Sequence, residues 1–204
     1  MNLKELVVKG RSIRRYHEDK PISEEVIIEL LDLARNCPSA RNDQPLKFLI
    51  SVCKEENDLI FPCLKWAGYL NDWDGPAPGE RPVAYIVVLG DNKVGSAFVE
   101  CDAGIVMQTI VLGAAEKGIG LCIIGSIDRP KLRSIMNIPE QYKIVYVLSL
   151  GYPAETVVLE ETGEDSDIKY WRDKDGVHHV PKRSLDELIL NISNEFPEKL
   201  PEDY

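Results

Sequence analysis

The connector from Gly10 to Lys20 carries the densest group of side chains that could bind an anion. Its central run is Arg11-Ser12-Ile13-Arg14-Arg15-Tyr16. Three guanidinium groups and a hydroxyl within five positions can surround one phosphate with charge-assisted, bidentate donors. The alternative is a basic connector that pairs with acidic groups on the surface, because charge runs are usually solvated. The residues alone leave both interpretations open.

A second group of candidate functional residues is aromatic. Trp66, Tyr69 and Trp73 lie in one short segment that runs into Asn71–Arg81, a stretch dense in Asp, Gly and Pro that predicts a loop. Exposed aromatic side chains beside such a loop suit contact with a flat small molecule. Core packing of the same side chains is the alternative, and the sequence does not decide between the two.

The common nucleotide-binding and hydrolase motifs do not fit this chain. Gly118, Gly120 and Gly125 suggest a dinucleotide fingerprint, but here a helix is predicted before the glycines and a strand after them. That order is the reverse of what the fingerprint requires. The sequence also contains no GxxxxGK[ST] loop and no GxSxG elbow.

The cysteines and histidines predict neither a metal site nor a catalytic centre. Five scattered cysteines without a CxxC pair favour reduced thiols that pack in the core. The three histidines lie in polar connectors with no nucleophile beside them, so we expect them to be solvated. The residues in question are Cys37, Cys53, Cys63, Cys101, Cys122, His17, His178 and His179.

The composition predicts one globular domain of the α/β or α+β type. The chain has 204 residues, of which 44% are hydrophobic, enough to bury a sizeable core. A net charge of −10 argues against nucleic-acid binding, which needs a surplus of Lys and Arg. The longest apolar run, Ala103–Ala115, is too short and too polar to span a bilayer, and no leader peptide is evident. We therefore expect a cytoplasmic protein with no membrane partner.

Hydrophobic periodicity places these groups on and between a series of helices and strands. Helices are predicted over 2–9, 23–36, 97–117, 130–136 and 184–192, and strands over 46–53, 83–89, 119–124 and 142–150. Ser23 and Asp128 are the expected N-caps, and Gly118 ends the long helix. The polar segment from Ala154 to Pro181 has no sustained period and is predicted to be a loop. So long a loop is uncommon in a compact domain, which favours its packing on a partner subunit.

Five blocks of this sequence resemble the signatures of the nitroreductase family, in the same order. The run from Arg11 resembles RRSxRxF/Y, and Pro38-Ser39-Ala40-Arg41-Asn42-Asp43-Gln44-Pro45 resembles PSxxNxQPW. The stretch from Asp102 to Gly125 is similar to DxxxAxQN followed by GLGTCWIG, and Tyr142–Pro153 is similar to a strand that ends in LGYP. Pro181–Ile189 is similar to RKPLEEI. Three positions depart from the pattern: Gly10 replaces Arg, Leu46 replaces Trp and Ser184 replaces Pro.

The resemblance implies an α+β fold, with a mixed, largely antiparallel central sheet flanked by helices, in an intertwined homodimer. It implies a single domain over residues 1–204, in which 154–204 form a C-terminal extension that packs on the partner subunit. It also implies an FMN in each of the two sites between the subunits.

The family pattern assigns each candidate residue a part of this FMN. Four residues would hold the phosphate, and one arginine would lie against the pyrimidine end, where a cation stabilises the negative charge of reduced flavin. In the second block, Ser39, Ala40 and Asn42 would reach the partner's flavin, while Pro38 and Gln44 are assigned to cofactor binding only. Two residues at a strand end would lie along the isoalloxazine near N5. The phosphate residues are Arg11, Ser12, Lys182 and Arg183, and the arginine at the pyrimidine end is Arg14. The cofactor residues of the second block are Pro38, Ser39, Ala40, Asn42 and Gln44, and those at the strand end are Ile124 and Gly125.

The implied activity is transfer of hydride or electrons from NADH or NADPH, through FMN, to a small acceptor such as a nitroaromatic or a quinone. FMN carries this chemistry, so the sequence need not supply a catalytic acid or nucleophile. Trp66, Tyr69 and Trp73 are the expected substrate-side residues. The alternatives are a non-enzymatic flavin-binding or storage protein, a dehalogenating or enone reductase, and a flavin-fragmenting enzyme of the same fold.

Overall fold

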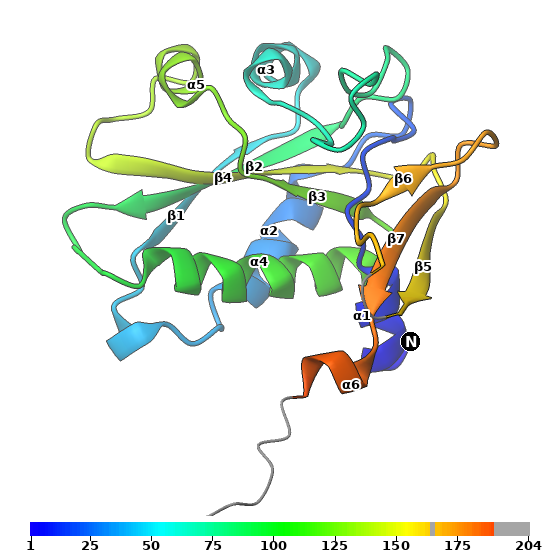
Figure 1. Ribbon diagram of the computed structural model, residues 1–204. Helices are drawn as coiled ribbons and strands as arrows, with labels where there is room; N and C mark the ends of the chain where they lie inside the picture. The colour runs from blue at the N-terminus through cyan, green and yellow to red at the C-terminus, as the bar shows by residue number, and fades with distance from the viewer. Residues whose placement is uncertain (164–165, 190–204) are drawn as a thin grey trace, which may run out of the picture.

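The centre of the protein is a four-stranded antiparallel sheet. A computed structural model describes residues 1–163 and 166–189. In the sheet the strands follow the order β1 (Leu46–Ser51), β2 (Ala84–Asp91), β4 (Tyr142–Gly151) and β3 (Gly120–Ile124). The inner strand β2 is apolar and buried along almost its whole length, because helices cover both faces of the sheet (Figure 1).

Two helices pack on each face of this sheet. In Figure 1, α2 (Glu24–Ala34) and α4 (Val99–Glu116) lie below the sheet, while α3 (Lys54–Ile60) and α5 (Arg129–Ile135) lie above it. Each face has its own apolar cluster, one centred on α2 and α4 and the other beneath α3 and α5. The short helix α1 (Leu3–Lys9) packs against α4.

Most of the elements predicted from periodicity are confirmed to within a few residues. Asp128 caps α5 as expected, because its carboxylate accepts a hydrogen bond from the Lys131 amide at 3.1 Å. Ser23 occupies the N-cap of α2 but makes no side-chain cap bond. The sequence analysis missed α3, which is only seven residues long and buries Asn57 and Ile60.

The prediction of a loop over residues 154–181 is wrong, because this segment forms most of a second sheet. Its strands are β5 (Val157–Thr162), β6 (Trp171–Arg172) and β7 (His178–Arg183), in the order β5-β7-β6. β5 and β7 are parallel, and β6 is antiparallel to β7. The expectation of a mixed central sheet is wrong, since the described pairings of its four strands are all antiparallel, and the parallel strand pair lies in the second sheet.

The strands of the second sheet escaped the sequence analysis because they are short and half-exposed. β5 exposes the apolar Val158 and Leu159 as well as Glu161, so its apolar and polar residues do not alternate, and Pro181 interrupts the pattern of β7. After β7, the chain turns into α6 (Leu185–Leu188), where the Ser184 hydroxyl accepts a hydrogen bond from the Glu187 amide. That cap gives Ser184 a role at the position where the family signature has proline. Residues 190–192 of the predicted last helix lie outside the described residues.

Within the described part of the chain, no helix combines the length and apolar character that crossing a bilayer requires.

Candidate functional site

The arginine-rich connector lies along the β3 side of the central sheet. The Ile13 amide donates to the Leu121 carbonyl at 3.0 Å, and Tyr16 is fully buried with its hydroxyl 2.9 Å from Ser149 Oγ. Two glycines permit this close approach. A Cβ on Gly120 would lie 2.8 Å from the Ile13 side chain, and one on Gly151 would lie 2.7 Å from the Tyr16 ring. The connector is therefore held firmly, and its arginines project from a fixed backbone.

Arg11 is a partly buried cation without an acidic partner among the described residues. Its guanidinium donates to the Val7 carbonyl, and its Nε is buried with no hydrogen-bond partner in residues 1–163 and 166–189. Burial lowers the pKa of Arg11 below its ordinary value. A surface groove of about 570 Å³ lies beside it, lined also by one further cation, Lys9, and by two acids, Glu5 and Glu155, of which Glu155 is already paired with Arg172. A desolvated guanidinium at the wall of a groove is suited to bind an anion.

The other two arginines of the connector differ from each other. Arg15 forms an ion pair with Glu80, in which Nε lies 2.9 Å from a carboxylate oxygen, so the interpretation as a paired surface charge holds for this residue. Arg14 instead lies against the second sheet. Its Nη1 is 3.2 Å from His178 Nε2, and its guanidinium carbon lies 4.9 Å from the centre of the Tyr170 ring.

A buried glutamate ties the connector to the second sheet. Glu155, whose side chain is fully buried, accepts hydrogen bonds from the Arg14 amide at 2.5 Å and the Arg15 amide at 3.2 Å. Its other oxygen lies 2.9 Å from Arg172 Nη2. No sequence pattern indicates these contacts, because Glu155 and Arg172 belong to the segment predicted to be a loop.

The second signature forms a strained loop at the start of β1. A 3-10 turn spans Ala40–Asn42, and its Ala40 amide donates to Asp102 Oδ1 at 3.0 Å. Arg41, Asn42 and Gln44 have φ values of 53°, 59° and 48°, in the left-handed region that residues with a Cβ seldom occupy. Clustered backbone strain of this kind is typical of ligand-binding segments.

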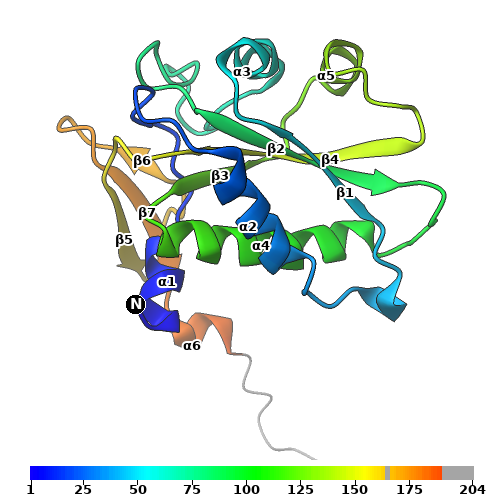
Figure 2. The ribbon, with the colours of Figure 1, turned by 180° about the vertical axis from the view of Figure 1, so that it is seen from behind.

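The two signatures lie at opposite ends of α4. Asp102, near the start of the helix, holds the second signature through Ala40. Gly10, at the start of the first signature, packs against Val111, where a Cβ would lie 2.7 Å from Val111 Cγ1. Nine residues of helix separate Asp102 from Val111, or about 14 Å. Figure 2 shows the same separation, with α1 at one end of α4 and the light blue turn before β1 at the other (Figure 2).

The close contact with Val111 also explains the departure at Gly10. A side chain at this position would require Val111 to move, so the arginine of the family pattern does not fit beside this α4.

The remaining cofactor candidates occupy two further places. Ile124 is buried at the end of β3, and Gly125 follows it on the surface, where its carbonyl accepts from Arg129 Nη2 at 3.3 Å. Lys182 and Arg183 are exposed at the end of β7, and Arg183 lies 3.6 Å from Glu187. Neither of these two residues lines the groove beside Arg11.

The aromatic candidates divide between the core and the surface. Trp66 is only 8% exposed and packs in the cluster beneath α3 and α5, 5.7 Å from the Phe61 ring. Tyr69 is 56% exposed, and its ring lies 5.0 Å from that of Tyr170. Trp73 lies beneath the Arg172 guanidinium at 4.7 Å. Tyr69 and Trp73 thus meet the second sheet close to Arg14, whereas Trp66 faces away from it into the core.

The expectation of solvated histidines holds for His17 and is wrong for the other two. His178 is buried, because β7 packs it between Arg14 and Tyr170. His179 stacks on Trp171 with ring centres 4.1 Å apart, and its ring nitrogens lie 2.5 Å from Glu160 and 3.2 Å from Asp173. These acids raise the pKa of His179, chiefly through the hydrogen bond to Glu160.

The cysteines are all free thiols. Cys63 and Cys122 are buried, and burial raises the pKa of both. Cys53 and Cys101 are exposed, so the expected core packing applies to only some of the five. No group of three or more metal-binding side chains comes together among the described residues.

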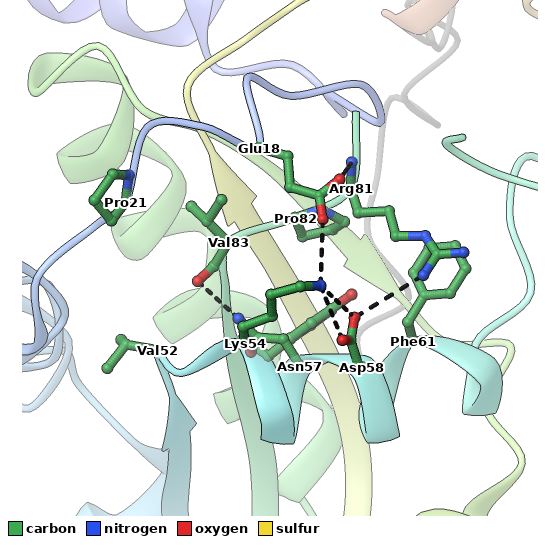
Figure 3. Close-up of a pocket in the computed structure, with 11 residues that line it drawn as sticks. Glu18, Pro21, Val52, Lys54, Asn57, Asp58, Phe61, Arg81, Pro82 and Val83 are labelled. Atoms are coloured by element: carbon green, nitrogen blue, oxygen red, sulfur yellow. Dashed lines mark hydrogen bonds and ion pairs between the residues drawn. The ribbon is translucent and has the colours of Figure 1, made fainter. Parts of the chain in front are cut away.

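A separate cavity of about 120 Å³ lies beside α3, away from every predicted site residue. Figure 3 shows its charged wall, where Lys54 reaches both Glu18 and Asp58 (Figure 3). Arg81 lies over the Phe61 ring at 4.3 Å and approaches the same Asp58. Arg81 Nε and the Tyr85 hydroxyl are buried here without a hydrogen-bond partner among the described residues, but none of the predicted site residues lines this cavity, so it is not the candidate site.

Comparison with known proteins identifies relatives of this chain in the family that the five sequence blocks resemble. Residues 7–152 match the model of the Nitroreductase family. A protein of Methanothermobacter thermautotrophicus, named "Putative NADH dehydrogenase/NAD(P)H nitroreductase", is 32% identical over 161 residues, which cover 76% of this chain and 79% of that protein. An iodotyrosine deiodinase of Thermotoga neapolitana is 23% identical over 168 residues, covering 74% and 88% of the two chains.

The fold matches as well. The solved structure of an FMN-dependent nitroreductase from Clostridium difficile R20291 superimposes with a TM-score of 0.65, at 22% identity, over 94% of this chain and 99% of that one. Together with the five sequence blocks, the family match shows that this chain belongs to the nitroreductase family of oxidoreductases.

Proposed function

We propose that this protein is an FMN-dependent oxidoreductase that passes reducing equivalents from NADH or NADPH to a small acceptor such as a nitroaromatic or a quinone. The observation that carries the proposal is Arg11. Its guanidinium is partly buried at the wall of a groove, and its Nε has no hydrogen-bond partner in residues 1–163 and 166–189, although Glu5 and Glu155 line the same groove. A phosphate is the kind of anion that such a site stabilises.

The residues present fit FMN in two further respects. Ser12, next to Arg11, offers an exposed side chain for a phosphate oxygen. Arg14 places a second cation on the same connector, and we assign it to the pyrimidine end of the flavin. Bound FMN supplies the capacity to accept a hydride and pass it on. Arg14 stabilises the negative charge that accompanies reduction, and Arg11 holds the cofactor in either state.

The separation of the two signatures supports a homodimer. Within one protomer, Ser39, Ala40 and Asn42 lie about two and a half helical turns of α4 away from the first signature. We therefore assign these contacts to a second copy. The outer side of α4 is suited to such an interface, because Phe98 and Ile105 are exposed by 53% and 39%, and a Cβ on Gly104 would meet open space.

The acceptor is expected to bind on the side of Tyr69 and Trp73. These aromatic side chains lie within reach of the second sheet and of Arg14, where a flat acceptor could stack beside the flavin. NADH or NADPH as donor is inferred from the names of relatives such as the Methanothermobacter protein.

The first experiment is an absorbance spectrum of the purified protein combined with light scattering. We expect a yellow dimer that releases one FMN per chain on denaturation. A monomer that keeps stoichiometric FMN would refute the two-subunit site.

A steady-state assay then separates the enzyme from a flavin-storage protein. NAD(P)H consumption that depends on a nitroaromatic or a quinone supports the proposal, while a protein that holds FMN without such turnover is a binding protein. Including an iodinated phenol and an enone among the acceptors tests the specialised reductases.

A further inference from the structure

The guanidinium of Arg14 is held by two side chains of the second sheet. His178 Nε2 lies 3.2 Å from Arg14 Nη1, and the Tyr170 ring covers the guanidinium with its centre 4.9 Å from the central carbon. The two rings also pack on each other, with centres 5.2 Å apart. Arg14 therefore has one hydrogen-bond acceptor at its tip and one aromatic face along its plane.

The contact with Arg14 determines the state of His178. An arginine can only donate, so Nε2 must be the acceptor and the ring proton must be on Nδ1. Nδ1 is buried and has no partner among the described residues. Burial, followed by the neighbouring charges of Arg14 and Arg172, lowers the pKa of His178 to about 4. His178 is therefore neutral at physiological pH and keeps its lone pair available for Arg14.

His178 is itself fixed by the second sheet. Its amide donates to the Thr156 carbonyl at 2.8 Å, and the residue pairs with Val157 in the parallel ladder of β5 and β7. Tyr170 is tied to the substrate-side segment, because its hydroxyl accepts from the Tyr69 amide at 3.3 Å. These two residues thus connect Arg14 to the second sheet and to the substrate-side segment.

We propose that His178 is a positioning residue, which accepts a hydrogen bond from Arg14 and, together with Tyr170, holds that guanidinium in place for the pyrimidine end of the flavin. This inference depends on the proposed function, since it assigns a part of the C-terminal extension to the same FMN site. A restrained Arg14 loses little conformational freedom when the cofactor binds. It also keeps its charge at the position where reduction of the flavin places negative charge.

The test compares His178→Leu with His178→Gln in the FMN-loaded protein. Leucine fills much of the space without an acceptor, whereas glutamine offers an oxygen near the position of Nε2. We expect His178→Leu to weaken FMN binding by about two- to twelvefold, the range of one lost hydrogen bond, and to lower the midpoint potential. His178→Gln should restore most of both. His179→Leu, one residue further along β7, is the matched control and should leave the potential unchanged.

A double-mutant cycle shows whether His178 acts through Arg14. In an Arg14→Ala background, His178→Leu should change neither FMN affinity nor potential any further. The inference is overturned if His178→Leu leaves both quantities at the wild-type values, or if it has the same effect with and without Arg14. Thermal melts of each variant identify general unfolding, which the glutamine variant should avoid. If the wild-type protein binds no FMN, the proposed function itself fails. If it binds FMN but the His178 variants behave like the wild type, only the role of His178 fails, so the two failures are distinguishable.

Discussion

Replacing Glu155 with alanine should strongly destabilise the protein, because it removes a buried carboxylate that ties the connector to the second sheet. The carboxylate is fully buried and accepts hydrogen bonds from the Arg14 and Arg15 amides and from Arg172. Without it, two amide donors lose their acceptor and Arg172, only 16% exposed, remains an unpaired cation. Breaking such a buried pair by removing one partner costs about 3–5 kcal/mol.

The assay is urea unfolding at fixed protein concentration, with a thermal melt beside it. For a chain of this size, 3–5 kcal/mol corresponds to a fall in Tm of about 6–20 °C. Glu155→Gln keeps an oxygen for the two amides but loses the charge opposite Arg172, so we expect an intermediate loss of about 1.5–3 kcal/mol.

Glu160→Ala provides the control for this prediction. Glu160 also pairs with a basic side chain of the second sheet, His179, but it is 42% exposed. Its removal should cost less than about 1 kcal/mol. The reasoning is wrong if the free energy of unfolding of Glu155→Ala lies within about 1 kcal/mol of that of the control, which is the size of an exposed ion pair. In that case the second sheet is not anchored through Glu155.

Four further outcomes are expected. Arg11→Ala should raise the Kd for FMN by roughly ten- to more than a hundredfold, measured by flavin fluorescence, whereas Lys54→Ala, which removes an exposed cation paired with Asp58, should leave it unchanged. Tyr69→Ala should alter the ratio of kcat/KM between a nitroaromatic and a quinone without affecting FMN binding; equal effects on both acceptors would argue against substrate contact. Trp66→Ala should instead cost about 3–5 kcal/mol of stability, because its indole is buried. Finally, the pKa of His178 in the folded protein is about 4, below its ordinary 6.5, so its contribution to stability is complete above pH 6.5 and is lost as the pH falls towards 4. His178→Gln should therefore make the free energy of unfolding less dependent on pH between 4 and 6.5. An unchanged slope in this range would contradict the burial of a neutral ring.

The central part of the fold was predictable because its elements carry long, uniform signals. β2 and α4 are apolar runs bounded by turns, and each was identified to within two residues at either end. The second sheet gave no such signal. Its strands depend on pairing between Val157–Thr162 and His178–Arg183, and the half-exposed side chains of such a pair do not alternate cleanly.

The candidate site was predictable in its residue types and much less in its contacts. Arg11, Arg14 and Arg15 are equivalent by composition, yet within residues 1–163 and 166–189 only the Arg15 side chain pairs with an acid, Glu80, which lies 65 positions along the chain. The burial of His178 likewise depends on strand β7. Neither contact is local in sequence, so no spacing rule could have indicated it.

The placement of the two signatures at opposite ends of α4 has a genetic consequence in the proposed homodimer. Each flavin site would combine the first signature of one copy with the second signature of the other. A chain damaged at Arg11 and a chain damaged at Asn42 would both form inactive dimers with themselves. When the two assemble together, both defects fall on the same site and the other site is left intact. Two inactive alleles expressed in one cell would therefore restore part of the activity, and the mixed dimer would carry a single working flavin.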